Sequence, residues 1–295
     1  MKGENKMNEN ELKQVVREIL TGMMEHPESM LSEFAAGHSP INITAPDISA
    51  LNLQNELYVE NPHDRAGYME MKQTTSARIG VGRAGPRPNN KTLLRFRADH
   101  AAAMDAVFND VSEDTIKAMD LLAVNSSAAD RSAHLMDPNA GRGFHEETEK
   151  LLKSQCKNAP QVQIVVSDGL SSTAVEENIR DLLPALMQGL SKNNLTVGTN
   201  IFVKFGRVGI GDAIGGILLP EIVIVLLGER PGLVTNSSLS CYMTYLPRPG
   251  MAESSRTVVS NIYKNGTPPA EAGAYIADIA QKMLAGKASG IDLKL

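Results

Sequence analysis

The chain of 295 residues has only two cysteines, no tryptophan and no long apolar run. Cys156 and Cys241 are too few for a disulfide framework and lack the spacing of a zinc site, so we interpret them as structural thiols in a reducing cytosol. The longest apolar stretch, Ala213 to Gly228, is interrupted by Pro220 and Glu221 and is shorter than the roughly 20 residues of a membrane-spanning helix. No signal peptide is evident at the N-terminus. These absences predict a soluble protein.

Complete catalytic motifs are absent as well. The sequence has no G-x-S-x-G elbow, no Walker loop and no H-E-x-x-H motif. His63, His100, His134 and His145 form no metal triad, and we interpret them as surface or satisfied core histidines. The net charge of −5 argues against general binding of nucleic acid. We therefore predict no catalytic residue and no metal ligand in this chain.

Two apolar runs each lead into a polar loop that contains glycine. Val162 to Val166 precedes the loop 167–172, and Ile222 to Leu227 precedes the loop 228–233. Continuous β-branched runs are typical of strands that are covered on both faces in a parallel sheet. Loops at the carboxyl ends of such strands hold the ligands of α/β proteins.

Strand and helix patterns alternate from about Leu121 onward, which predicts an open α/β sheet. Strands are expected at 162–166, 200–205, 222–227 and 239–245, and helices at 143–156, 173–190, 210–218 and 268–284. Five loops are expected to share one rim of this sheet and to offer N–H groups and hydroxyls to a phosphate-bearing ligand. These loops are 167–172, 206–209, 228–233, 245–250 and 261–269. Ordinary loops bounded by glycine are the alternative.

The N-terminal part differs from the rest. Apolar residues recur every three or four positions over 11–24, as in an amphipathic helix, and a segment rich in proline, serine and asparagine follows. We expect this helix to dock on a partner or a surface; the alternative is an ordinary core helix. The chain is thus predicted to comprise the helix and a flexible linker (1–57), a small mainly helical domain (58–117) and a Rossmann-like α/β domain (118–295). The helical domain is expected to have helices from Asn90, its N-cap, to Phe108 and around 112–122.

The segment from Gly80 to Gly85 matches the dinucleotide pattern G-x-G-x-x-G, but Pro86 and Pro88 follow where a helix should begin. We therefore assign no NAD site to it. The surrounding segment from Arg78 to Arg97 carries six basic residues and no acidic one. It could meet a phosphate or an acidic partner, or form a solvated face balanced by the protein's own carboxylates.

Eight short signatures occur in order along the chain: Gly82–Pro88, Leu94–His100, Val166–Ser171, Gly228–Leu233, Leu239–Tyr242, Ser260–Ile262, Gly266–Pro269 and Lys287–Ile291. With them the sequence closely resembles, from about Tyr58 to the C-terminus, the small (light) subunit of ethanolamine ammonia-lyase. That bacterial enzyme depends on adenosylcobalamin and converts ethanolamine to acetaldehyde and ammonia by a radical mechanism.

The resemblance implies that the cofactor lies between this chain and a large barrel subunit that carries the substrate site. The family's cofactor contacts fall on Val208, Glu229 and Val258, and valine at position 258 makes a thiol-specific role there untenable. No D-x-H-x-x-G motif is present, so a histidine that replaces the cobalamin's own base is not expected.

The resemblance also implies a hetero-oligomer of large and small subunits, located in the cytoplasm within a bacterial microcompartment. The N-terminal helix would direct it there by binding the shell or other cargo. Two other functions stay open from the sequence. One is a stand-alone nucleotide- or NAD-dependent α/β enzyme, and the other is a structural subunit that binds no ligand.

Overall fold

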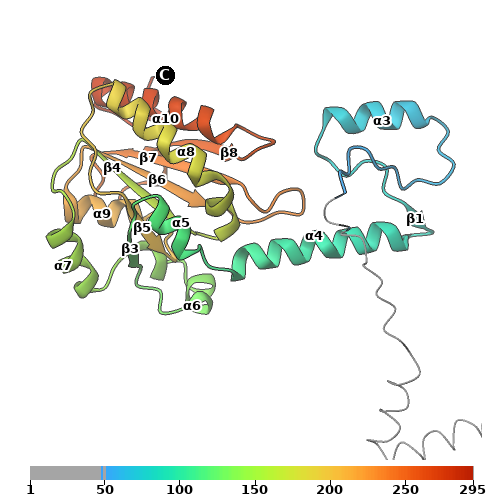
Figure 1. Ribbon diagram of the computed structural model, residues 1–295, viewed down its shortest axis with the longest axis horizontal. Coiled ribbons are helices and arrows are strands. Elements are labelled where there is room, and N and C mark those ends of the chain that lie inside the picture. The colour runs from blue at the N-terminus through green and yellow to red at the C-terminus, as the bar shows by residue number, and fades with distance from the viewer. Residues whose placement is uncertain (1–47, 49–50, 295) are drawn as a thin grey trace, which may run out of the picture. The chain divides into compact units, whose positions relative to one another are not determined.

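The computed structural model describes residues 48 and 51–294 (Figure 1). The predicted amphipathic helix over 11–24 lies outside the described residues. The chain divides into two compact units, residues 1–47 and 48–295, and only the second is described here. The predicted division into three domains stays a prediction.

A six-stranded sheet with the order β3-β5-β4-β6-β7-β8 forms the centre of the second unit. Its strands are β3 (Leu122–Asn125), β4 (Val162–Ser167), β5 (Ile201–Lys204), β6 (Ile222–Gly228), β7 (Leu239–Tyr245) and β8 (Arg256–Ile262). The first four strands of this order, β3, β5, β4 and β6, are parallel to one another. Strand β7 pairs antiparallel with β6, and β8 pairs antiparallel with β7. The α/β class is therefore confirmed with a mixed sheet, and the Rossmann-like description stays a prediction.

Connection length explains the antiparallel half of the sheet. Ten residues (229–238) join β6 to β7, and ten more (246–255) join β7 to β8. A parallel pair needs a crossover of about a dozen residues or more, usually with a helix. The chain therefore turns back at both places, which the expectation of a parallel sheet did not include.

Helices cover both faces of the sheet (Figure 1). Alternate strand residues such as Ile164 and Ile224 pack with α8 (Ser172–Lys192) and α10 (Pro269–Gly286) in one apolar core. Val165 and Val225 pack on the other face with α7 (Glu146–Gln155) and α9 (Ile210–Leu218). A sheet with two apolar faces needs these two layers of helix, and the continuous apolar runs of β4 and β6 follow from that burial.

Most predicted elements are confirmed. The bounds of α9 and β7 agree with the prediction, and α7, α8, α10, β4, β5 and β6 differ by at most three residues at either end. Cys241 is fully buried in the α8 core and Cys156 is partly buried, as expected for structural thiols. Burial raises the pKa of both thiols.

Two strands of the six-stranded sheet were missed, as was the short hairpin at 83–88. The helix predicted around 112–122 ends early as α5 (Glu113–Ala118), because Asp120 adopts a left-handed conformation (φ 50°) and β3 starts at Leu122. Strand β8 is an edge strand in which Val258 is half exposed, so its sequence lacks the apolar run that marks β4 and β6.

Residues 51–108 contain α3 (Arg65–Thr74), a hairpin of β1 (Arg83–Ala84) and β2 (Arg87–Pro88), and α4 (Asn90–Phe108). Helix α4 is confirmed, but its cap is Asn89 rather than Asn90, because the Asn89 side chain accepts the Thr92 N–H at 3.0 Å. Gly85 lies in the turn of the hairpin with φ 63°. This turn needs glycine for its backbone conformation, which explains part of the G-x-G-x-x-G pattern without a nucleotide.

Within the part of the chain that the structure describes, no helix is long and apolar enough to cross a membrane. The histidine, cysteine and acidic side chains of the same part form no group of three or more that could hold a metal ion.

Candidate functional site

The carboxyl ends of β4, β5 and β6 meet at one edge of the sheet, since Ser167 pairs with both Val203 and Leu227. We call it the carboxyl edge. The loops 167–172, 206–209 and 228–233 leave the sheet there. Leu239 pairs with Gly228 and with Ile262, so the loop 261–269 lies at the same edge. Four of the five predicted loops thus share one rim.

The fifth loop, 245–250, lies at the opposite edge, and its placement in the rim was wrong. Tyr245 pairs with Ile222, the first residue of β6, and the Leu246 N–H donates to the Glu221 carbonyl at 2.7 Å. The error follows from strand direction, because β7 runs antiparallel to β6.

Glycine lets two of the rim loops approach closely. A Cβ on Gly228 would lie 2.1 Å from the Ser171 carbonyl oxygen and 2.3 Å from that of Asp168. A Cβ on Gly169, which has φ 53°, would lie 2.4 Å from the Gly228 carbonyl oxygen. The Leu170 N–H donates to that same oxygen at 2.9 Å. Only glycine fits at both positions, so the loops after β4 and β6 pack backbone against backbone.

Two of the three predicted cofactor contacts, Glu229 and Val258, lie beside Tyr242 of β7. The Tyr242 hydroxyl donates to Oε1 of Glu229 at 2.5 Å, and Tyr242 pairs across the sheet with Val258. Tyr242 and Val208 both pack against the α9 core. Burial and the Glu229 carboxylate raise the pKa of Tyr242, so its hydroxyl stays a donor. The sequence did not single out Tyr242, although it belongs to one of the signatures.

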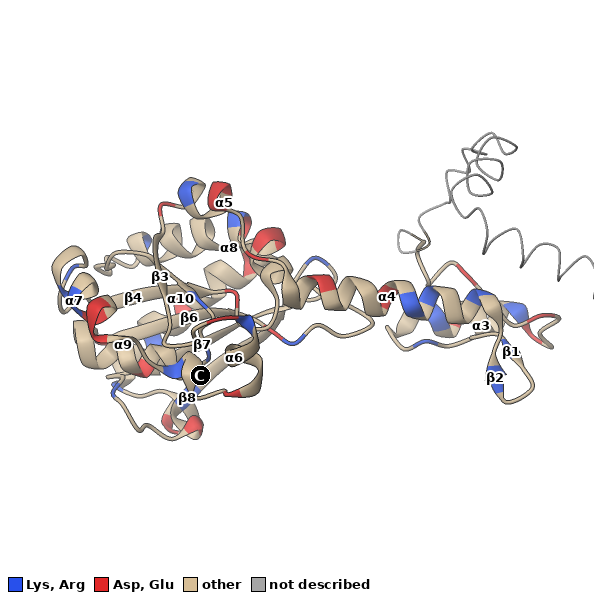
Figure 2. Ribbon diagram, turned by 90° about the horizontal axis from the view of Figure 1, so that it is seen from below, with Lys and Arg blue, Asp and Glu red and all other residues tan. Residues whose placement is uncertain are grey.

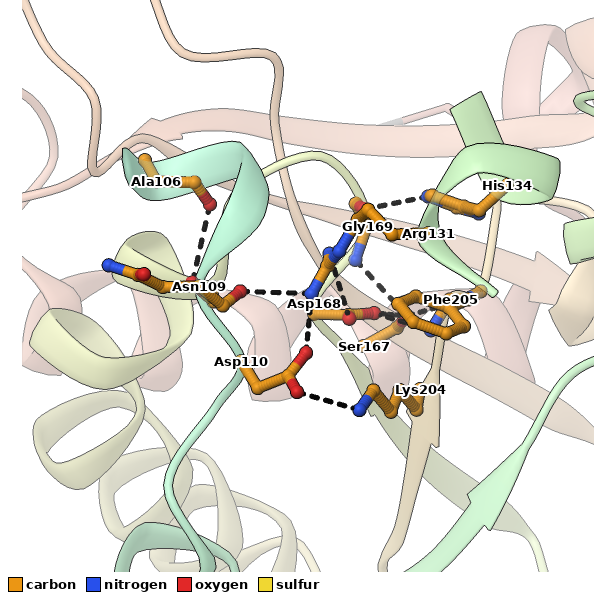
Figure 3. A network of polar contacts seen from close by, with 12 residues as sticks. Ala106, Asn109, Asp110, Arg131, His134, Ser167, Asp168, Gly169, Lys204 and Phe205 are labelled. Carbon is orange, nitrogen blue, oxygen red and sulfur yellow. Dashed lines mark hydrogen bonds and ion pairs between the residues drawn. The ribbon is translucent and has the colours of Figure 1, made fainter. Parts of the chain in front are cut away.

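A polar network fixes the start of the loop that carries Val208 (Figure 3). Phe205 adopts a left-handed conformation (φ 62°), which costs a residue with a Cβ about 1–2 kcal/mol. Its N–H donates to Oδ1 of Asp168 at 2.7 Å, and its carbonyl accepts the Ser126 hydroxyl at 2.9 Å. The next residue, Gly206, donates its N–H to the Ser167 hydroxyl at 3.0 Å. The contacts hold the chain in this turn.

Arg131 and Lys204 connect the network to the end of α4 (Figure 3). Arg131 contacts Asp168 at 3.5 Å and Asp110 at 2.5 Å, and Lys204 lies 2.8 Å from the other Asp110 oxygen. The Arg131 guanidinium also lies 4.6 Å from the centre of the Phe205 ring. No local motif marks these residues, because Arg131 and Asp168 are 37 positions apart in the chain.

Known proteins match this chain over almost its whole length. The family model of the ethanolamine ammonia-lyase light chain matches residues 65–294. The ethanolamine ammonia-lyase small subunit of Clostridium perfringens is 46% identical over 295 residues, covering 98% of this chain and 100% of the relative. Those of Listeria innocua and Clostridioides difficile are 47% and 45% identical over 293 residues, with the same two coverages. The chain belongs to the ethanolamine ammonia-lyase small-subunit family.

The resemblance inferred from the sequence is thereby confirmed, and the chain is a subunit of a two-subunit lyase. The assignment of Val208, Glu229 and Val258 to a cofactor stays a prediction. What the structure adds is that Glu229 and Val258 both lie beside Tyr242, and that Tyr242 and Val208 pack against the same α9 core.

His134 and Asp168 are the two buried titratable groups of this small subunit's network. His134, in α6 (Arg131–Met136), donates from Nε2 to the Gly169 carbonyl at 2.8 Å and stacks on Phe205. Burial first, then the nearby Arg207, lowers its pKa to about 4, whereas burial raises the pKa of Asp168 to about 6. His134 is thus a core histidine, although its Nδ1 has no hydrogen-bond partner among the described residues. Both groups are buried, so they hold the loops in place.

Proposed function

We propose that this chain is the small subunit of an adenosylcobalamin-dependent ethanolamine ammonia-lyase and holds the cofactor at the interface with the large subunit. The cofactor, when bound, supplies an adenosyl radical that removes hydrogen from an unactivated carbon, and ethanolamine becomes acetaldehyde and ammonia. The observation that carries the proposal is the placement of Glu229 and Val258 beside Tyr242, which packs against the same core as Val208, while the loops that carry Val208 and Glu229 leave the carboxyl edge. This edge is where α/β sheets bind ligands.

The residues present suit such a cofactor. Cobalamin has apolar ring faces and peripheral amides, so it needs apolar contacts together with hydrogen-bond acceptors. Val258 is 48% exposed, and Val208 is partly buried and packs against the α9 core. Tyr242 binds one oxygen of Glu229 and leaves the other to accept an amide N–H. The side chains would bind and orient the cofactor while the large subunit carries the substrate.

Glu229→Ala is expected to raise the dissociation constant of adenosylcobalamin for the two-subunit complex by about tenfold. A hydrogen bond to a charged group contributes about 1.5 kcal/mol or more, and the substitution removes its acceptor. Tyr242→Phe, which only loosens the Glu229 side chain, should raise the constant about threefold. An absorbance titration of the reconstituted complex measures both.

Glu221→Ala is the matched control, because Glu221 is exposed and lies at the opposite edge. An unchanged dissociation constant in Glu229→Ala removes this residue from the site. Turnover by the purified chain alone with NAD, or full activity of the large subunit without this chain, would overturn the proposal as a whole.

The proposal extends to location and domain organisation. Residues 1–57 would form a targeting helix and linker that place the enzyme in a bacterial microcompartment, and 58–117 a small helical domain. Residues 118–295 would form a Rossmann-like cofactor domain, which the parallel strands β3, β5, β4 and β6 with helices on both faces support.

Deletion of residues 1–25 is expected to leave lyase activity intact and to send the enzyme to the free cytosol. The apolar stripe over 11–24 is the segment that would bind shell or cargo. Fluorescence microscopy of tagged full-length and truncated complexes measures the location. Unchanged encapsulation of the truncated enzyme would rule the targeting role out.

A further inference from the structure

A mostly apolar cavity of about 280 Å³ lies among residues 53–96, none of which belongs to the six-stranded sheet. Its walls come from α3, from the segment before the β1–β2 hairpin and from the start of α4. They include Leu53, Tyr58, Ile79, Val81 and Phe96. Neither the proposed cofactor contacts nor the network at the carboxyl edge takes part in it.

One wall of the cavity carries a buried ammonium group. Lys72 of α3 is only 5% exposed, and its Nζ donates to the Ile79 carbonyl at 2.8 Å. No carboxylate of the described residues lies within 4 Å of Nζ, and burial lowers the pKa of the group. Lysine has three N–H donors, and a buried charge is costly without a partner. Glu56 also lines the cavity and its charge acts on Lys72, but it forms no ion pair with Nζ, so only one of the three N–H donors has an acceptor among the described residues. A carboxylate from a partner would supply a second acceptor.

Exposed cations surround the same part of the chain. Arg78 and Arg95 pair with Asp99, at 2.6 and 2.9 Å. Four more basic residues, all exposed, have no acidic partner among residues 51–294: Arg83, Arg87, Lys91 and Arg97. Figure 2 shows basic residues on α4 and the hairpin. The carboxylates of residues 51–294 therefore pair with only part of the basic segment.

Exposed apolar side chains at the rim indicate a macromolecular partner. Phe96 lines the cavity and is 45% exposed, and Leu94, in a neighbouring hollow that shares Tyr58, is 51% exposed. A small molecule inside the 280 Å³ cavity would leave Leu94 in water, because Leu94 lines only the neighbouring hollow. A second copy of this chain, docked through the same face, would bring the same cations against each other. An acidic partner with an apolar anchor meets all of these requirements.

We propose that this cavity is a docking site for the large subunit. An apolar side chain of the large subunit fills the cavity, a neighbouring aspartate or glutamate reaches Lys72, and further acidic residues face the exposed cations. The inference rests on the two-subunit assembly of the proposed function and is independent of the cofactor contacts.

Lys72→Met is expected to weaken binding of the large subunit at least tenfold and to reduce its dependence on salt. Methionine keeps the length of the side chain but cannot pair with a carboxylate. The isolated variant should unfold at the same urea concentration as the unmodified chain or higher, because a buried ammonium has been replaced by an apolar group. Titration calorimetry with purified large subunit at two salt concentrations measures the affinity.

Lys157→Met serves as the matched control, because Lys157 is exposed and also donates to one backbone carbonyl. Val81→Phe is a second variant that keeps Lys72 but fills the cavity, and it should weaken binding to a similar extent. Unchanged affinity in both Lys72→Met and Val81→Phe would overturn the proposal. The proposal would also be overturned if Lys72→Met abolished self-association of the small subunit and left its binding to the large subunit unchanged.

The cofactor titration separates this inference from the proposed function. With saturating large subunit, Lys72→Met should bind adenosylcobalamin with the unmodified dissociation constant. A null result in Glu229→Ala would remove that residue from the cofactor site and leave the docking site standing.

Discussion

Replacing Arg256 with methionine is expected to lower the free energy of unfolding by about 3–5 kcal/mol. The Arg256 guanidinium binds both carboxylate oxygens of Asp212, at 2.9 and 2.8 Å, and only 3% of its side chain is exposed. Hydrogen bonds to Asp212 raise the pKa of Arg256, so the guanidinium stays charged. Its removal leaves the buried Asp212 carboxylate without a counter-charge. Urea denaturation at pH 7 measures the loss.

Arg142→Met is the matched control for this prediction, since Arg142 and Arg256 both contact Glu253. The Arg142 pair is 3.5 Å long, and both its side chains are more than half exposed, at 52% and 59%. Exposed ion pairs contribute about 1 kcal/mol or less, so this variant should lose little stability. Equal losses in the two variants would contradict the assignment of a structural role to the buried pair.

The same ion pair also affects the candidate site. Asp212 lies in the first turn of α9, directly after the loop that carries Val208, and Arg256 begins β8, which carries Val258. The pair therefore links two of the three predicted cofactor contacts. A weaker affinity of Arg256→Met for adenosylcobalamin would agree with this link.

Elements with a strong local pattern could be predicted, and the direction of strands could not. The apolar periodicity of α9 and the run of β7 gave correct bounds. A run of apolar residues looks the same in either direction, so β7 could not be recognised as antiparallel, and the loop 245–250 was placed at the wrong edge. Strand β8 is half exposed at the edge of the sheet, and β3 has only four residues, so neither has a pattern long enough to decide.

The candidate site was predicted as far as its loops and was missed where it depends on distant contacts. Gly169 and Gly228 marked the two loops in the sequence. The structure explains why glycine occurs there, because the two loops approach too closely for a Cβ at either position. Arg131 and His134 contact the loop after β4 although they lie more than 30 positions earlier in the chain. Only the folded structure brings them close to that loop. Asp168 was part of a signature, but its burial could not be read from its neighbours. Such groups have no local signal, because tertiary packing alone creates them.

Asp168→Asn and His134→Gln are expected to change the pH dependence of stability in opposite directions. Asp168 has pKa 3.8 when unfolded and about 6 in the fold, which burial causes. As the pH falls from 6 to 4 the folded chain takes up this proton first, so stability rises. His134 has pKa 6.5 unfolded and about 4 folded, mainly through burial and then Arg207. Over the same range the unfolded chain is protonated first, so stability falls.

For each group, the difference between its folded and unfolded pKa corresponds to about 3 kcal/mol of unfolding free energy. The contributions of Asp168 and His134 therefore nearly cancel in the unmodified chain between pH 4 and 6.5. Asp168→Asn leaves only the histidine effect, and its free energy of unfolding should fall relative to the unmodified chain as the pH is lowered. His134→Gln leaves only the aspartate effect and should rise by a similar amount.

Urea denaturation at several pH values, taken as variant minus unmodified chain, removes the contributions of all other titrating groups. If this difference in the free energy of unfolding does not change with pH for either variant, Asp168 and His134 titrate as exposed groups. The buried network behind Phe205 would then not hold the loop that carries Val208. Slopes of opposite sign would show that burial shifts both groups toward their neutral forms in the native state, as the contacts around Phe205 require.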